Sequence, residues 1–231
     1  MKSTKLAVAL LAATGLSAIA APAMAYEAGD WLIRGRIINI NPQDSSSSLS
    51  TSGLGDIGKG IEVNSDTIPE LDITYMINRN WGIELILGYS EHTVRTHKAA
   101  GATVGGLGSR DVIDTKVLPP TLTLQYHFLP DSNIRPYVGA GINYTYFFDE
   151  SVPSKSGVAA AGDKVKLDSS WGFAVQAGVD VAINDDWFVN LDVKYIDIET
   201  TGHFKNTVAG SIKVDSDIDP LVFGIGIGRR F

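Results

Sequence analysis

Two kinds of side chain alternate strictly along Trp171-Gly-Phe-Ala-Val-Gln-Ala-Gly-Val-Asp-Val-Ala182. The odd positions are all apolar, and the even positions are small or polar. Successive side chains of a β-strand point to opposite faces, so this strand has one apolar face and one compact polar face. The pattern fits a soluble β-sandwich, in which the apolar face is the core, or an outer-membrane barrel, in which that face contacts lipid.

The same two-residue period recurs in seven further segments, at 31–40, 67–77, 81–92, 121–128, 136–148, 187–195 and 221–228. Three connections between these segments are short, and four are long and polar, at about 41–66, 96–112, 149–166 and 199–217. We therefore predict an all-β fold, an eight-stranded antiparallel transmembrane β-barrel with short periplasmic turns and long extracellular loops. Closing the sheet into a barrel pairs the backbone N–H and C=O groups of every strand, which is required in the membrane interior because lipid offers them no hydrogen-bond partners.

The positions of the aromatic residues favour the barrel over the sandwich, because they form two groups. The group near the short turns contains Tyr75, Trp81, Tyr126, Phe128, Tyr137 and Trp187. The group near the long connections contains Tyr89, Tyr144, Tyr146, Phe148, Trp171 and Tyr195. Two belts of amphipathic rings match the two interfaces of a membrane, whereas a sandwich would bury such rings in the middle of its strands.

The first 25 residues have the features of a secretory signal peptide. Lys2 and Lys5 precede an apolar stretch at 6–21, and Ala23-Met-Ala25 supplies the small residues of a cleavage site. An uncleaved membrane anchor is the alternative. We predict a cleaved signal peptide at 1–25 and a single outer-membrane β-barrel domain at 26–231.

Composition excludes several classes of function. The chain has 19 Lys and Arg against 26 Asp and Glu, a formal net charge of −7, and no basic cluster. Nucleic-acid binding requires a basic face, so no nucleic-acid partner is expected. The absence of cysteine excludes disulfides, thiolate nucleophiles and cysteine-type zinc sites.

Motifs for chemistry are weak. Gly53-Leu-Gly55-Asp-Ile-Gly58 matches the letters of a dinucleotide fingerprint but lies in a long polar connection, so no cofactor is expected. His92, His97 and His203 lie in or beside the long connections, and we expect no metal site there. Ser90 with His92 is the nearest approach to a catalytic pair, but it lacks an acidic group to orient the imidazole. We therefore expect no enzyme activity.

Several blocks of the chain resemble the OmpW family of small outer-membrane proteins. The blocks are Leu124-Gln-Tyr-His-Phe128, Arg135-Pro-Tyr-Val-Gly-Ala-Gly-Ile-Asn-Tyr-Thr-Tyr-Phe147, Ser170-Trp-Gly172, Trp187-Phe-Val-Asn-Leu-Asp-Val-Lys-Tyr-Ile-Asp197 and the end of the chain, Asp219-Pro220 with Gly226-Ile-Gly-Arg-Arg-Phe231. The resemblance implies an eight-stranded barrel in the bacterial outer membrane that admits small hydrophobic molecules. It also implies that Phe231 is the signal for the barrel-assembly machinery, and it makes outer-membrane lipid and lipopolysaccharide expected partners.

The lumen of an eight-stranded barrel is only wide enough for side chains to fill it. Its predicted inward positions carry four positive and five negative charges, and buried charges persist only when they are paired. We therefore predict a structural ionic plug made of Arg34, Arg36, Glu70, Asp72, Glu84, Asp180, Asp192, Lys194 and Arg230.

The outer half of the lumen is expected to be apolar. The inward residues predicted to bind ligand in this upper lumen are Ile38, Ile40, Ile68, Phe147, Ile196 and Ile198. The alternative is that these strand tips lie above the membrane and pack against loops.

Prolines suggest where a ligand leaves the lumen. Pro119 and Pro120 fall within the fourth predicted strand, just before its alternating part at 121–128, and Pro69 falls within the second. Each proline removes one donor from the ladder. These three residues are our predicted lateral gate, although β-bulges that shape the barrel explain them equally well. The sequence thus favours passive uptake of small hydrophobic solutes with lateral release into the bilayer. The alternative is a structural or receptor barrel, for a colicin, a phage or a host surface, with a sealed lumen.

Overall fold

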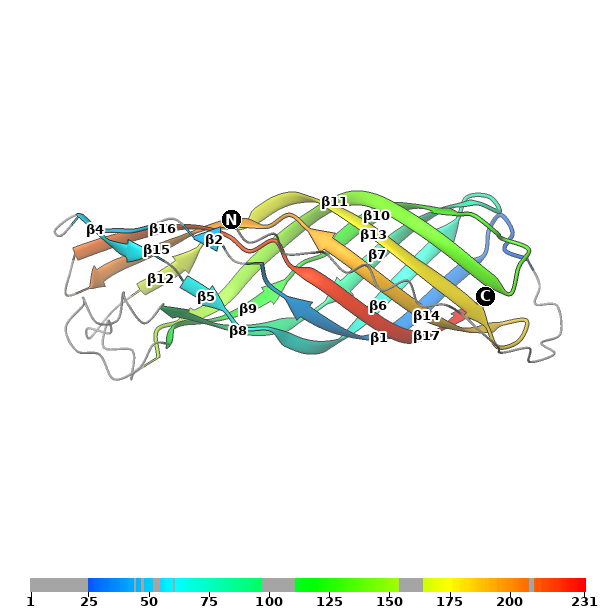
Figure 1. The fold of residues 1–231 in the computed structure, drawn as a ribbon, viewed down its shortest axis with the longest axis horizontal. Coiled ribbons are helices and arrows are strands. Elements are labelled where there is room, and N and C mark those ends of the chain that lie inside the picture. The colour runs from blue at the N-terminus through cyan, green and yellow to red at the C-terminus, as the bar shows by residue number, and fades with distance from the viewer. Residues whose placement is uncertain are drawn as a thin grey trace, which may run out of the picture.

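The computed structural model describes residues 25–43, 45–46, 48–51, 55–59, 61–96, 111–153, 164–207 and 210–231, which form strands and connections (Figure 1). No helix in these ranges is long and apolar enough to cross a membrane. Eight antiparallel strands form a closed barrel, in the order β10-β7-β6-β1-β17-β14-β13-β11 with β11 pairing back to β10. They are β1 (Trp31–Asn41), β6 (Asp66–Met76), β7 (Trp81–Gly88), β10 (Thr121–His127), β11 (Ile134–Ser151), β13 (Ser170–Ala182), β14 (Trp187–Ile196) and β17 (Leu221–Arg230).

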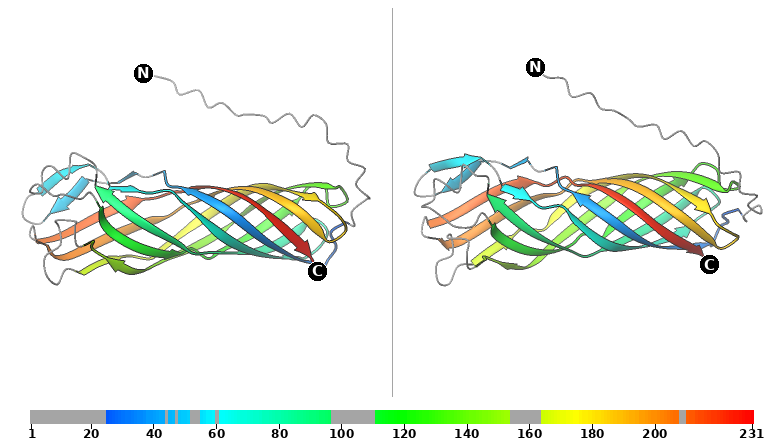
Figure 2. Two further views of the ribbon diagram at one scale, coloured as in Figure 1. Left: turned by 90° about the horizontal axis from the view of Figure 1, so that it is seen from below. Right: turned by 60° about the horizontal axis from the view of Figure 1, so that its bottom comes forward.

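The two ends of the barrel chain meet on one side. β1 pairs with β17 from Leu32 opposite Arg230 onwards, and the backbones of Trp31 and Phe231 exchange hydrogen bonds of 3.0 and 2.9 Å. Figure 2 shows the first and last strands side by side, both inclined around the barrel axis. The eight-stranded antiparallel barrel predicted from the alternation is therefore confirmed.

Side chains of the barrel strands alternate between lipid and lumen as the sequence predicts. Along β1 every second residue from Leu32 to Ile40 is buried, while Trp31, Ile33 and Ile37 are exposed. Trp171, at the start of β13, is 72% exposed, which a water-soluble sandwich core would not allow. The outer surface of the barrel is covered by exposed apolar side chains, and the lumen holds both polar and apolar buried side chains.

Short turns close the end of the barrel that carries the C-terminus. Asn78 accepts hydrogen bonds of 2.9 Å from the backbone nitrogens of Asn80 and Trp81. Asn184 accepts bonds of 3.0 and 2.9 Å from the backbone nitrogens of Asp186 and Trp187. Asparagine stabilises such tight turns because its side chain bonds to the backbone two or three residues on.

At the opposite end, described portions of all four long connections form strands, which the sequence analysis did not predict (Figure 1). A second sheet has the order β12-β15-β16-β3-β4, and β2 pairs with β16. Its strands are β2 (Ser45–Ser46), β3 (Ser48–Thr51), β4 (Gly55–Lys59), β12 (Lys164–Leu167), β15 (Glu199–Thr207) and β16 (Gly210–Asp217). The other added strands continue the barrel sheet beyond β11 in the order β9 (Asp111–Leu118), β8 (Ser90–Thr96) and β5 (Ile61–Val63). Outside the membrane an outward-facing residue contacts water, so little apolar contrast remains for a sequence pattern to reveal.

Two of the predicted strands are interrupted. The segment 81–92 divides at Tyr89 into β7 and β8, and β9 ends at Leu118, so that Pro119 and Pro120 lie between β9 and β10 rather than within a strand. Proline has no backbone N–H to donate to a ladder, which accounts for the second interruption.

Aromatic side chains form close pairs on the outer surface of the barrel. Ring centroids lie 5.0 Å apart in Trp31–Tyr75 and 4.7 Å apart in Tyr144–Trp171. Tyr137 is a correction, because this predicted belt residue is 1% exposed and lies in the lumen. Its position in the alternation already assigned it to the inward face.

Candidate functional site: a layered lumen

Glu84 is the centre of a buried polar network in the lumen. Its Oε1 lies 3.0 Å from Arg34 Nη1 and 3.3 Å from Arg36 Nη2. Its Oε2 accepts hydrogen bonds of 2.7 Å from the side-chain amides of both Gln125 and Gln176. A single carboxylate thereby joins side chains from β1, β7, β10 and β13 across the lumen.

Further ion pairs surround Glu84. Arg34 Nη2 lies 2.8 Å from Asp180 Oδ2, and Arg36 Nε lies 2.6 Å from Asp72 Oδ2. Asp192 lies 3.0 Å from Arg36 and 3.2 Å from Lys194, and the Lys194 ammonium lies 2.6 Å from Glu70. These side chains are at most 4% exposed. A charge this deeply buried persists only when it is paired, and each charged side chain of the network has an oppositely charged partner.

The predicted plug residues meet in this network, with Arg230 as the exception. Arg230 instead lies at the periplasmic rim, where its Nη1 donates to the Ala25 carbonyl at 2.7 Å and lies 3.7 Å from Asp30. Arg230 is the last inward residue of β17 and lies closer to the periplasmic end of the barrel than the network does. The alternation predicts that its side chain points inward but not how far along the barrel axis it lies.

Sequence reasoning missed the neutral members of the network. Tyr137 donates to Asp192 Oδ2 at 2.7 Å, and Asn190 donates to Asp180 Oδ1 at 2.8 Å. Tyr137 lies against Gly178, where an added Cβ would come within 2.4 Å of the phenol ring. Tyr137, Asn190, Gln125 and Gln176 all occupy inward positions of the alternation, and this position was the signal that could have identified them as lumen residues.

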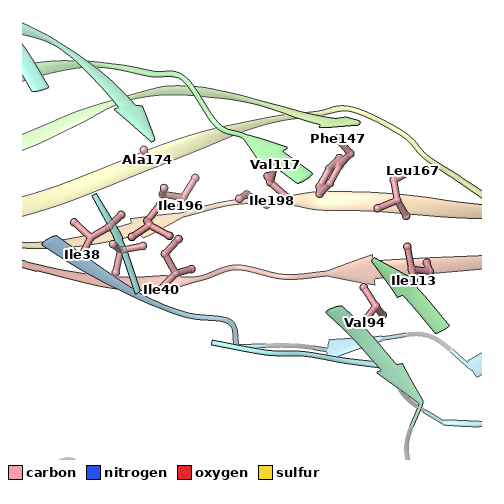
Figure 3. Close-up of a cluster of buried hydrophobic side chains, with 12 residues drawn as sticks. Ile38, Ile40, Val94, Ile113, Val117, Phe147, Leu167, Ala174, Ile196 and Ile198 are labelled. Atoms are coloured by element: carbon pink, nitrogen blue, oxygen red, sulfur yellow. The ribbon is translucent and has the colours of Figure 1, made fainter. Parts of the chain in front are cut away.

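Above the network lies a cluster of buried apolar side chains (Figure 3). All six residues predicted to line the upper lumen belong to it: Ile38, Ile40, Ile68, Phe147, Ile196 and Ile198. Val94 on β8, Ile113 on β9 and Leu167 on β12 extend it upwards. The cluster therefore continues from the barrel strands into the outer strands.

One polar pair lies among the outer strands. His92 Nε2 is 3.0 Å from Ser90 Oγ, and His92 Nδ1 is 3.1 Å from the Asn64 carbonyl. Burial lowers the pKa of His92 below its usual range, which favours the neutral imidazole. His203 lies elsewhere, 3.0 Å from Asp168, and His97 is outside the described residues. Across the described ranges, no three His, Asp or Glu side chains group as metal ligands would.

The barrel wall has a seam with incomplete pairing. The β7–β10 ladder ends at Ile86 opposite Thr121, and the β8–β9 ladder begins at Ser90 opposite Val117. Among the described pairings, residues 87–89 and 118–120 have no partner across this seam. Three consecutive cross-strand pairs are thus missing from the wall without any shift of register.

On the side away from the seam, Pro119 and Pro120 are hydrogen-bonded to β11. Tyr144 donates its backbone N–H to the Pro120 carbonyl at 3.1 Å, and the Asn143 side chain donates to the Pro119 carbonyl at 3.3 Å. The third predicted gate residue, Pro69, pairs with Ile37 on β1 and immediately precedes Glu70, where the β6–β7 ladder begins.

Comparisons with known proteins agree with this architecture. A model of the OmpW family matches residues 27–231. Outer membrane protein W of Vibrio cholerae is 39% identical over 234 residues, which cover 100% of both chains. The crystal structure of OprG from Pseudomonas aeruginosa matches with a TM-score of 0.80 and 37% identity, over 90% of this chain and 98% of that one. The dibenzothiophene metabolism operon protein PahQ of Pseudomonas aeruginosa is 28% identical, over 94% of this chain and 95% of its own.

Outer membrane protein W and OprG are both named as outer-membrane proteins, and their likeness to this chain extends over nearly its full length. The chain therefore belongs to the OmpW family, and it is a protein of the bacterial outer membrane.

Proposed function

We propose that this protein takes up small hydrophobic molecules passively across the outer membrane. The observation that carries the proposal is the stacking of an apolar cluster directly on a sealed ionic network within one lumen. An apolar solute has a binding surface above, no passage straight down, and a weakly paired seam in the wall beside it.

Capture is the first step. Ile38, Phe147 and Ile196 belong to the buried apolar cluster, so a solute that separates these side chains exchanges water for hydrocarbon contacts. Burial of about 200 Å² of apolar surface contributes roughly 5 kcal/mol, enough to hold a two-ring molecule transiently. No specific polar contact is required, which suits uptake of a chemical class rather than of one compound.

The ionic network prevents axial passage. Moving a solute past Glu84 would separate it from Arg34 and Arg36 in a lumen with little water. Breaking a buried ion pair by removing one partner costs about 3–5 kcal/mol, and here several pairs share the same carboxylates. Lateral exit is therefore the cheaper path.

We place the exit at the seam between β7–β8 and β9–β10. Residues 87–89 and 118–120 lack cross-strand pairs there, so opening the seam breaks no ladder in those rows. The β11 side is closed by bonds to Pro119 and Pro120. Pro69 lies at the edge of the same weak region. Pro119 thus contributes by offering no N–H group to the seam.

A relative supports the class of solute. PahQ is named for an operon of dibenzothiophene metabolism, and dibenzothiophene is a fused, uncharged aromatic compound of the kind that an apolar lumen would accept.

Liposome uptake of an apolar solute such as naphthalene tests the proposal. We expect Pro119→Ala with Pro120→Ala to slow uptake several-fold, because Pro119→Ala supplies an N–H group that can close the seam, while the main chain of residue 120 faces β11. Pro136→Ala, in a fully paired part of β11 opposite Val179, is the matched control and should leave the rate unchanged. An unchanged rate in the double variant would refute lateral exit at this seam.

A receptor or structural role is the second candidate, favoured by the sheet of β12, β15, β16, β3 and β4 beyond the barrel (Figure 1). In that case protein-containing liposomes would take up naphthalene no faster than empty ones.

A further inference from the structure

The periplasmic end of the lumen is occupied by the first described part of the chain. Gly29 donates its backbone N–H to the Met76 carbonyl at 2.8 Å, and Met76 donates to the Asp30 carbonyl at 2.9 Å. Gly29 has a φ of 96°, a left-handed value that glycine adopts without strain. This turn directs the preceding residues back under the barrel instead of away from it.

Tyr26 is completely buried at the end of this segment. Its hydroxyl donates to Asp180 Oδ2 at 3.0 Å, and its backbone nitrogen donates to the Pro130 carbonyl at 3.2 Å. The Arg135 guanidinium lies 4.2 Å from the centre of its ring, and His127 meets the ring edge-on at 5.4 Å. The hydroxyl and the main-chain nitrogen of Tyr26 are therefore hydrogen-bonded, and its ring contacts a cation and a second aromatic ring.

Tyr26 also connects two layers of the lumen. Asp180 accepts the hydrogen bond from the Tyr26 hydroxyl and belongs to the ionic network, because it pairs with Arg34. Its ring packs in an apolar cluster with Leu32, Met76 and Phe188, which come from three different strands. The tyrosine therefore completes a floor beneath the charges, at the end of the barrel that the short turns surround.

We propose that the periplasmic mouth of the barrel is a binding site for a phenol ring, that Tyr26 is its built-in ligand, and that the docked tyrosine separates the polar lumen from periplasmic water. The sequence predicts cleavage after Ala25, which makes Tyr26 the first residue of the mature chain. Its new ammonium group would then lie beside the Pro130 carbonyl and strengthen that contact. The site is independent of whatever the upper lumen binds.

A cysteine reporter tests the proposal, since the natural chain has no cysteine. Leu32→Cys places a thiol in the buried cluster that Tyr26 covers. In detergent micelles, we expect Tyr26→Ala to increase the rate of labelling by a charged methanethiosulfonate at least tenfold. Tyr26→Phe keeps the ring and should stay within about threefold of the reporter alone. The exposed neighbour Glu27→Ala is the matched control and should not change the rate.

Chemical rescue tests the binding site itself. Millimolar 4-methylphenol should restore slow labelling to the Tyr26→Ala variant, whereas 4-methylcyclohexanol, which lacks a π face for Arg135, should not. Heat-modifiable electrophoretic mobility establishes that each variant is folded before labelling. Equal labelling of folded Tyr26→Ala and the reporter alone would overturn the seal. Faster labelling without rescue by the phenol would overturn the binding site.

Discussion

Individual side chains of the lumen depend on one another because they share partners. Glu84 joins two arginines and two glutamines, so its charge balances several groups at once. The sequence revealed this carboxylate, because an acidic residue in an otherwise apolar strand marks an inward position. It did not reveal which cations Glu84 meets, since those lie 50 and 48 residues away along the chain.

Glu84→Gln should destabilise the barrel by about 3–5 kcal/mol, because it leaves two buried guanidinium groups short of one negative charge. The amide of the new glutamine would also face the donor groups of Gln125 and Gln176. Urea unfolding in phospholipid vesicles measures the change. Glu91→Gln removes an exposed carboxylate and is the control. A loss below 1 kcal/mol for Glu84→Gln would contradict the central position of this residue.

Gly178→Ala should cost about 1–3 kcal/mol, since its Cβ would overlap the Tyr137 ring and the Leu191 carbonyl. Gly35→Ala is the matched control, because nothing lies within 4 Å of a Cβ built there. The same unfolding experiment compares the two variants. Equal effects would show that Tyr137 does not require the glycine surface opposite it.

His92 makes stability depend on pH in a defined direction. Burial lowers its folded-state pKa below the ordinary 6.5, so the unfolded chain takes up a proton at higher pH than the folded one. The stabilising contribution is complete above about pH 6.5 and decreases as the pH falls towards the folded-state value. We expect His92→Asn to flatten the loss of stability between pH 7.5 and 5. Identical slopes for wild type and His92→Asn would refute the assignment.

At the scale of strands, the period-two pattern predicted the barrel elements well because each barrel strand separates two different environments. It failed in outer strands where the two faces differ little in polarity, as in β15. It also missed the interruption at Tyr89, since the inward and outward residues of 81–92 keep alternating through it. The prolines marked the region of the seam but not which of the two neighbouring strands lacks pairing there.

Closing the seam should stop lateral release. Tyr89→Cys with Leu118→Cys would place two outward thiols in the same row of the unpaired region, and a short bismaleimide can join them. We expect cross-linking to slow naphthalene uptake several-fold. Leu85→Cys with Leu122→Cys spans an intact row of the same two strands and is the control. Equal uptake by the two cross-linked proteins would place the exit elsewhere.

At the scale of the molecule, the lumen consists of layers stacked along the barrel axis, and the inward residues of a single strand follow the order of these layers. From the periplasmic end, the inward residues of β1 read Leu32, Arg34, Arg36, Ile38 and Ile40. They belong in turn to the floor, the ionic network and the upper apolar cluster. The order of the layers could be predicted from the sequence, because the prediction requires only the inward residues and the direction of the strand. The floor also needs Tyr26, which precedes the first strand and has no periodic signal.

Crystals of the protein soaked with 1-bromonaphthalene would test the uptake account most directly, because bromine can be located by its anomalous scattering. We expect a bromine peak among Ile38, Phe147 and Ile196, or at the seam between Tyr89 and Pro119. A peak confined to the periplasmic side of Glu84, or to the outer lipid-facing surface alone, would contradict the account.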